Sequence, residues 1–181
     1  KLKKDLKPIR YKLGMPICDT SNIPNKIIVI LTGEARVVDG QINSCELISK
    51  LGANEFIGLA SIINARGCEL ISASTDLIGL SFSDKVIIKL YKEEESFRTW
   101  CNQKIHVAEI NQLANHLYKD VIDSKISIKQ LANILSSNIR IKTYENEAFI
   151  SNNTEIKNYL ISDNVNEAKI FDIVDQQKIS T

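Results

Sequence analysis

The chain has 181 residues, 44% of them hydrophobic, and a formal net charge of +1. This length accommodates one domain with an appendage, and the hydrophobic content is sufficient for a packed core. The near-zero charge argues against a protein that coats nucleic acid, and no apolar run is long enough to span a membrane.

The cysteines and histidines argue against a metal centre. The four cysteines are scattered without a CxxC pair, and only two histidines are present. This pattern is typical of reduced thiols in the cytoplasm, and we expect neither a metal nor a cofactor.

The first segment of the chain is strongly basic. Residues 1–14 carry six Lys or Arg against one Asp. Such a run can contact anionic lipid or a partner, but a solvated leading segment is the more common arrangement and the one that we expect here.

Short strands separated by turn residues are predicted over residues 9–82. The expected strands occupy residues 9–13, 26–38 (a hairpin pair around Thr32-Gly33) and 44–50. Asp39-Gly40 is the strongest hairpin-turn signal in the chain. The spacing predicts an α+β fold that is mainly β, an antiparallel β-roll or jelly roll flanked by helices, with a smaller C-terminal appendage.

The rest of the chain is organised around residues 47–80. An apolar strand ends at Leu51-Gly52, and a short apolar helical turn follows within residues 56–63. A strand then returns over residues 69–80, with a local bend expected at Thr75-Asp76.

Helical periodicity begins at Ser83, which is expected to cap a helix that ends near Tyr91. The expected later helices cover residues 97–117, capped by Ser96, and residues 126–135. Residues 159–175 are compatible with a strand pair or a terminal helix. His106 and His116 lie ten residues apart and are expected at the surface. The domain limits that follow are 1–118 and 119–181.

Residues 47–80 resemble the phosphate-binding cassette of cyclic-nucleotide-binding domains. In that family a Leu-Gly turn precedes a Gly-Glu pair, a small apolar helix, an Arg and a strand ending in Ala-x-Thr-Asp. The matching segments here are Leu51-Gly52, Gly58, Ala60-Ser61-Ile62-Ile63 and Ala73-Ser74-Thr75-Asp76. The resemblance implies a β-roll with a ligand pocket at Gly58, Leu59, Ala60, Ser61, Arg66 and Gly67.

Two departures from the family pattern imply that this pocket is degenerate. Leu59 stands where the family has the Glu that binds the ribose hydroxyl, and Leu cannot accept a hydrogen bond. Gly67 stands where the family has the phosphate-binding Arg, with Arg66 one residue early. Arg66 is expected to be a solvated turn residue, and Glu69, which has the wrong sign for a phosphate site, a surface residue of an edge strand.

The run from Phe56 to Glu69 also resembles a cyclic-nucleotide-binding-like domain at the N-terminus of cyanobacterial toxin- or peptide-secretion ABC transporters. Those domains carry Ile-Gly-x-Ala-Ser followed by Cys-Glu, as Ile57 to Ser61 and Cys68-Glu69 do here. The resemblance implies a regulatory or docking fragment of a larger exporter. Its partners would be other transporter domains or the cargo, and its location cytoplasmic, tethered to the inner membrane through the transporter.

Two other function classes compete with this interpretation. Residues 127–135 resemble the first helix of a helix-turn-helix, which would make the chain a receptor-type transcription regulator. The second helix lacks the required pattern, since Ser136, Lys142 and Glu145 fall at its turn and apolar positions, so no nucleic-acid partner is expected. No catalytic pairing or phosphate loop is readable, so an enzyme is not expected. The apolar stripe of helix 97–118 is a candidate homodimer surface.

Overall fold

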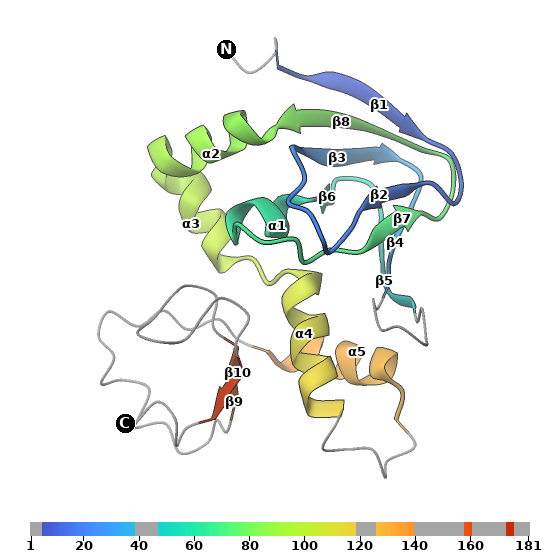
Figure 1. Cartoon of the computed structure of the whole chain (residues 1–181), viewed down its shortest axis with the longest axis vertical. Coiled ribbons are helices and arrows are strands. Elements are labelled where there is room, and N and C mark those ends of the chain that lie inside the picture. Colours follow the sequence, from blue (N-terminus) through green and yellow to red (C-terminus); the bar gives the residue numbers. More distant parts are fainter. Residues whose placement is uncertain (1–4, 39–46, 119–125, 140–157, 161–172, 176–181) are drawn as a thin grey trace. The chain divides into compact units, whose positions relative to one another are not determined.

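The computed structural model describes residues 5–38, 47–118, 126–139, 158–160 and 173–175. Within the first of two compact units, Lys1–Ala108, two four-stranded antiparallel sheets form a β-roll (Figure 1). The second unit is Glu109–Thr181. The predicted limits of 1–118 and 119–181 stay a prediction, because residues 119–125 lie outside the described part of the chain.

The first sheet has the strand order β1-β8-β3-β6. Its strands are β1 (Lys7–Tyr11), β8 (Leu77–Ser83), β3 (Lys26–Thr32) and β6 (Phe56–Ile57). β1 is an edge strand that contains Pro8, which has no N–H to donate and is tolerated at an edge. It begins two residues before the predicted first strand.

The second sheet has the strand order β2-β7-β4-β5. Its strands are β2 (Pro16–Cys18), β7 (Ile71–Ala73), β4 (Ala35–Val38) and β5 (Leu47–Leu51). β4 and β5 pair antiparallel, as the Asp39-Gly40 signal between them suggests, although that turn itself lies outside the described residues. The expected β-roll is therefore confirmed.

The predicted hairpin over residues 26–38 is wrong. β3 pairs with β6 and β8, whereas β4 pairs with β5 and β7, so the chain passes from one sheet to the other between them. Gly33 makes this corner, with a φ of 87°. A Cβ at Gly33 would lie 2.3 Å from the Asp76 carbonyl oxygen, which explains why the corner requires glycine.

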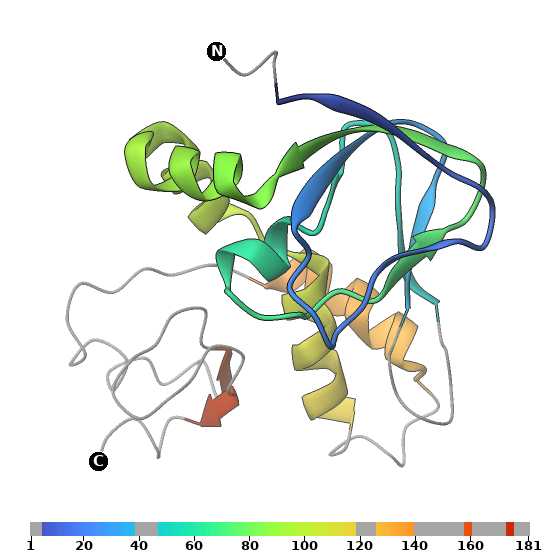
Figure 2. The ribbon, with the colours of Figure 1, turned by 45° about the horizontal axis from the view of Figure 1, so that its top comes forward.

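The core of the roll lies between the two sheets (Figure 2). Strand alternation directs one set of apolar side chains inward from both sheets. This buried set comprises Cys18, Ile28, Ile30, Ala35, Val37, Leu51, Ile57, Ile71, Ala73 and Leu77. A second buried cluster, Ile27, Leu59, Ile62, Ile87 and Cys101, joins the roll to its helices.

Three helices of the first unit match their predicted positions in part. α1 (Leu59–Ile63) follows β6, and α2 (Asp84–Glu93) begins at Ser83, whose side chain accepts the Val86 N–H as predicted. α3 (Glu95–Gln103) starts after Glu94 rather than at Ser96. These helices lie at one end of the roll, away from the turn that joins β1 to β2 (Figure 1).

The single long helix predicted over residues 97–117 is wrong. It is divided into α3 and α4 (Val107–Tyr118), because Lys104 adopts extended backbone angles at the end of α3. At the break, the Lys104 ammonium lies 5.1 Å from the ring centroids of both Phe56 and Trp100, which holds the connector against the roll.

The second unit contains the rest of α4 and α5 (Ile128–Asn138), which Ser127 caps together with Gln130 in a reciprocal capping box. β9 (Asn158–Leu160) and β10 (Ile173–Asp175) pair antiparallel, as one of the two alternatives for residues 159–175 requires. No helix in the described part of the chain is long and apolar enough to cross a membrane.

Candidate functional site

The cassette begins where β6 ends, at Gly58. Gly58 has a φ of 86° and precedes the first residue of α1. A Cβ there would lie 3.1 Å from the Lys26 carbonyl oxygen and from Pro24. Glycine therefore makes the sharp turn that directs the first amides of α1 toward a single point.

α1 is buried on nearly every side. Leu59 and Ala60 are each 1% exposed and Ser61 is fully buried. Leu59 packs in the apolar cluster with Ile27 and Ile87. The Leu59 side chain is therefore part of the core.

Glu69 lies at the point toward which these amides are directed. Its carboxylate accepts hydrogen bonds from the Gly58 N–H (3.3 Å), the Ser61 N–H (3.1 Å) and the Ser61 hydroxyl (2.9 Å). Glu69 is 8% exposed, so the expectation of a surface residue is wrong. The chain thus supplies its own anion to the amides of its cassette.

Ser61 connects the Glu69 carboxylate to Cys68, the residue that precedes Glu69 in the sequence. Its hydroxyl oxygen accepts the Cys68 N–H at 3.2 Å and lies 3.4 Å from the Cys68 sulfur. The side chain of Ser61 therefore bridges α1 and the segment before β7. This bridge fixes the position of Glu69 along the cassette.

A cavity of about 90 Å³ lies beside Glu69. Its polar lining comes from Glu55, Glu69, Lys104 and His106, and its apolar lining includes Val37, Leu51 and Ile71. Pockets for small organic ligands usually have volumes of about 300–1,000 Å³. This cavity has room for a few water molecules, at about 30 Å³ each.

Burial dominates the electrostatics of Glu69 and of Cys18. It raises the pKa of Glu69, while the hydrogen bonds from Ser61 and Gly58 and the nearby charge of Lys104 lower it. Burial raises the pKa of Cys18 to about 12, and the carboxylate of Glu69 adds to the effect. Cys18 is consequently an inert thiol.

His106 is also buried, at 8% exposed, which contradicts its predicted surface position. Burial, with a contribution from the charge of Lys104, lowers its pKa to about 4. The imidazole is therefore neutral at pH 7. The side chain of His116 lies outside the described residues.

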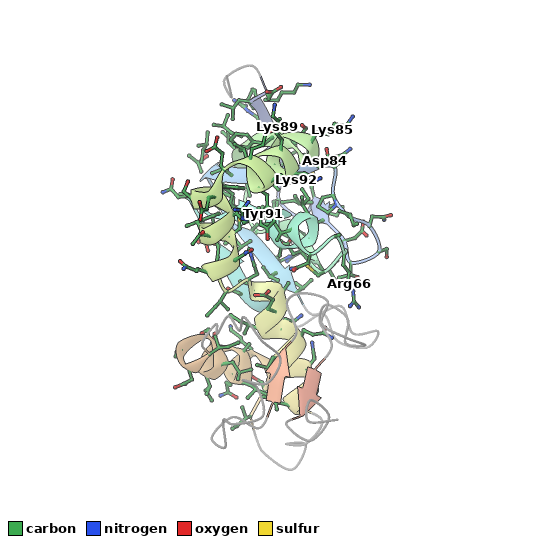
Figure 3. All side chains as sticks on the ribbon, turned by 90° about the vertical axis from the view of Figure 1, so that its left-hand side faces the viewer. Arg66, Asp84, Lys85, Lys89, Tyr91 and Lys92 are labelled. Carbon is green, nitrogen blue, oxygen red and sulfur yellow. The ribbon has the colours of Figure 1, made fainter. Side chains whose placement is uncertain are left out.

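The structure separates Arg66 from Glu69. Arg66 is exposed, and it projects outward from the loop that follows α1 (Figure 3). Gly67 lies against the loop before β3, where a Cβ would be 2.7 Å from the carbonyl oxygens of Thr20 and Asn22. Of the six predicted pocket residues, Gly58 and Ser61 contact the carboxylate, whereas Leu59 is part of the core.

Strand alternation is a sequence signal that places the Glu69 side chain in the core. Ile71 and Ala73 point into the core from β7, and Glu69 has the same parity along the chain. Continued alternation would place its side chain inward as well. Lys104 and His106 have no comparable signal, because helical periodicity continues across the break between α3 and α4.

The similarity of this chain to known proteins lies in structure rather than in sequence. No protein-family model and no curated sequence matches the chain. Similar solved structures include the regulatory subunit of a cAMP-independent protein kinase A from Trypanosoma brucei (15% identity, 54% of this chain and 42% of that chain, TM-score 0.42). At this coverage the chain spans less than half of the trypanosome protein.

Two bacterial structures are also similar. One is a putative cyclic nucleotide-binding protein from Geobacter metallireducens (8% identity, 54% of this chain and 71% of that chain, TM-score 0.46). The other is a cyclic nucleotide-binding domain from Methylobacillus flagellatus (17% identity, 75% of this chain and 70% of that chain, TM-score 0.47). At these identities and scores, neither bears on what this chain binds.

Proposed function

We propose that this chain is a non-catalytic regulatory or docking domain whose nucleotide pocket is closed by its own side chain. The observation that carries the proposal is the set of three hydrogen bonds to the buried carboxylate of Glu69. A cyclic phosphate that used the same amides would have to displace this carboxylate. It would otherwise lie beside a second negative charge in a site with little solvent screening.

The other contacts that a cyclic nucleotide needs are also missing. Leu59 cannot accept a hydrogen bond from a ribose hydroxyl, and Arg66 is exposed on the loop after α1. Losing a charge-assisted contact and leaving one hydroxyl unpaired together cost about 3–6 kcal/mol. This cost weakens binding by about two to four orders of magnitude. The domain is therefore expected to act through protein contacts.

A place in a secretion ABC transporter is supported by the resemblance of the run from Phe56 to Glu69. The distinguishing Cys68-Glu69 pair has a defined local role here: Cys68 donates its N–H to Ser61, and Glu69 binds the amides. We propose that domains with this pair share a self-occupied cassette. In such a domain the β-roll would dock other transporter domains or cargo without a nucleotide signal.

The transcription-regulator alternative keeps one supporting observation. α5 is present with its Ser127–Gln130 capping box, where the first helix of a helix-turn-helix was predicted, but it continues through Ser136, the predicted turn position, to Asn138. The second helix would fall within residues 140–157, outside the described part of the chain. Electrophoretic mobility shifts with random-sequence duplex DNA, repeated at raised salt, test this alternative separately.

Calorimetric titration with cyclic AMP and cyclic GMP tests the proposal. A micromolar site weakened by two to four orders of magnitude would have a dissociation constant of about 0.1–10 mM, and we expect values in this range for both ligands. The two ligands should also leave the melting temperature unchanged, since a ligand stabilises the folded state only when its concentration approaches its dissociation constant. A dissociation constant of about 10 μM or below for either nucleotide would refute the closed pocket.

A further inference from the structure

The β1–β2 turn, the β3–β4 corner and the β7–β8 turn meet at the end of the β-roll opposite its helices (Figures 1 and 2). The first two of these segments expose large apolar side chains. Leu13 is 67% exposed, and Met15 and Leu31 are each 45% exposed. We call these three side chains the tip patch. Single exposed apolar residues are common, but three on adjoining turns form a local apolar surface.

The first turn is rigidly attached to the roll. Within it, the Met15 N–H donates to the Lys12 carbonyl at 3.0 Å. It is also tied to β7, because the Gly14 N–H donates to the Ala73 carbonyl and the Ala73 N–H to the Met15 carbonyl, both at 2.9 Å. The Leu13 N–H donates to the Asp76 carboxylate at 3.0 Å. Leu13 therefore points outward from an ordered turn.

The second turn follows Leu31 and is hydrogen-bonded to the segment between β7 and β8. The first turn is hydrogen-bonded to the same segment. Leu31 is the extra residue of a β-bulge, since its neighbours Ile30 and Thr32 pair with Gly79 and Ile78. A bulge redirects a side chain, and this one leaves Leu31 exposed beside the buried Ile30. The Glu34 N–H then donates to the Thr75 hydroxyl at 2.9 Å, next to the Asp76 that holds Leu13.

Basic side chains lead to the tip patch. Arg10 and Lys12 are exposed, while Ile9 and Tyr11, which alternate with them, pack against the core. No acidic residue occurs between positions 7 and 18. Of the carboxylates near the tip, Asp76 accepts the Leu13 N–H and Glu34 pairs with Lys50 at 2.8 Å.

We propose that the tip patch docks on the surface of an anionic lipid bilayer. A stable protein–protein interface buries about 800 Å² on each partner, more than three side chains on turns can supply. Docking on a bilayer requires a smaller surface. A few large apolar residues insert shallowly, and basic residues contact the headgroups. Because hydrogen bonds already hold both turns, insertion costs little conformational entropy.

Vesicle co-sedimentation of the whole chain tests this docking. The protein should sediment with vesicles that contain about one third phosphatidylglycerol, and raised salt should weaken this binding since it screens exposed charges. Leu13→Ser and Leu31→Ser should each weaken binding about tenfold, because each removes a large apolar side chain from the inserted surface. Lys12→Gln should weaken it about fivefold.

Matched controls come from α2, at the other end of the roll. Ile88 is 41% exposed and Lys85 is exposed, so Ile88→Ser and Lys85→Gln should leave vesicle binding unchanged. If the two controls weaken binding as much as the tip variants do, adsorption is nonspecific and the proposal is wrong. Failure of the unaltered chain to bind anionic vesicles would equally reject the proposal.

A second measurement does not depend on the stability of the serine variants. Trp100 is the only tryptophan, so Leu13→Trp in a Trp100→Phe background places one fluorophore at the tip. Its emission should shift to shorter wavelength on anionic vesicles and be quenched by brominated lipid. An unshifted, unquenched emission from protein that sediments with the vesicles would show that another surface binds.

Discussion

Replacing Glu69 by Ala removes the acceptor on which the cassette amides depend. Two buried backbone donors, the Gly58 and Ser61 N–H groups, then lose their partner. Each unsatisfied buried donor costs about 1–3 kcal/mol, so the free energy of unfolding should fall by about 2–6 kcal/mol. The Ser61 hydroxyl adds little, since it still lies 3.4 Å from the Cys68 sulfur and can turn toward it.

Two opposing effects place the expected loss toward the lower end of that range. The substitution removes a buried charge whose desolvation already raises the pKa of Glu69. Water from the adjacent cavity of about 90 Å³ can also bind the exposed amides. We therefore expect a loss of about 2–3 kcal/mol.

Urea unfolding followed by circular dichroism measures this loss, with Glu34→Ala as the matched control. Glu34 forms an exposed ion pair with Lys50, and its removal should cost less than about 1 kcal/mol. If Glu69→Ala is no more destabilising than Glu34→Ala, the carboxylate does not hold the cassette. Unfolding midpoints of both variants should be compared at one pH.

The sign of the pH dependence gives an independent check on Glu69. Because its pKa is raised in the folded state, protonation favours folding. The stability of the unaltered chain relative to Glu69→Gln should therefore be greatest below about pH 4.3, the usual glutamate pKa, and should decline as pH rises through the folded pKa. A relative stability that instead increases with pH would contradict the assignment.

Two further predictions concern His106, in the connector between α3 and α4, and Leu113, on α4. The folded pKa of His106 is lowered to about 4, so the unaltered chain should lose about 3 kcal/mol of stability relative to His106→Asn as pH falls from about 6.5 to 4. Parallel acid-unfolding curves for the two proteins would show that His106 titrates normally. Leu113 is 9% exposed, and Leu113→Glu should lower stability by a few kcal/mol at unchanged mass by light scattering. A shift from dimer to monomer would instead identify the stripe of α4 as a homodimer surface.

The sequence alone determined the fold class and most element positions, because these depend on local periodicity and turn chemistry. Ser83 begins α2 as predicted, since a hydroxyl that caps a helix acts within one turn. The bend at Thr75-Asp76 and the small apolar helix α1 likewise follow from neighbouring residues. The absence of a hydrogen-bond acceptor from the side chain at position 59 was also readable, because the identity of Leu59 is visible without coordinates.

Only the tertiary structure decided what the cassette contains. Glu69 and the Gly58 amide are eleven positions apart in sequence, and their meeting depends on the turn at Gly58 and on the inward face of the strand that follows. The break between α3 and α4 has a similar origin. Trp100 and Phe56 come from different elements, and Lys104 lies against both rings where periodicity alone would have continued the helix. Long-range contacts of this kind leave no periodic signal, because each depends on the register and packing of segments that are distant in sequence.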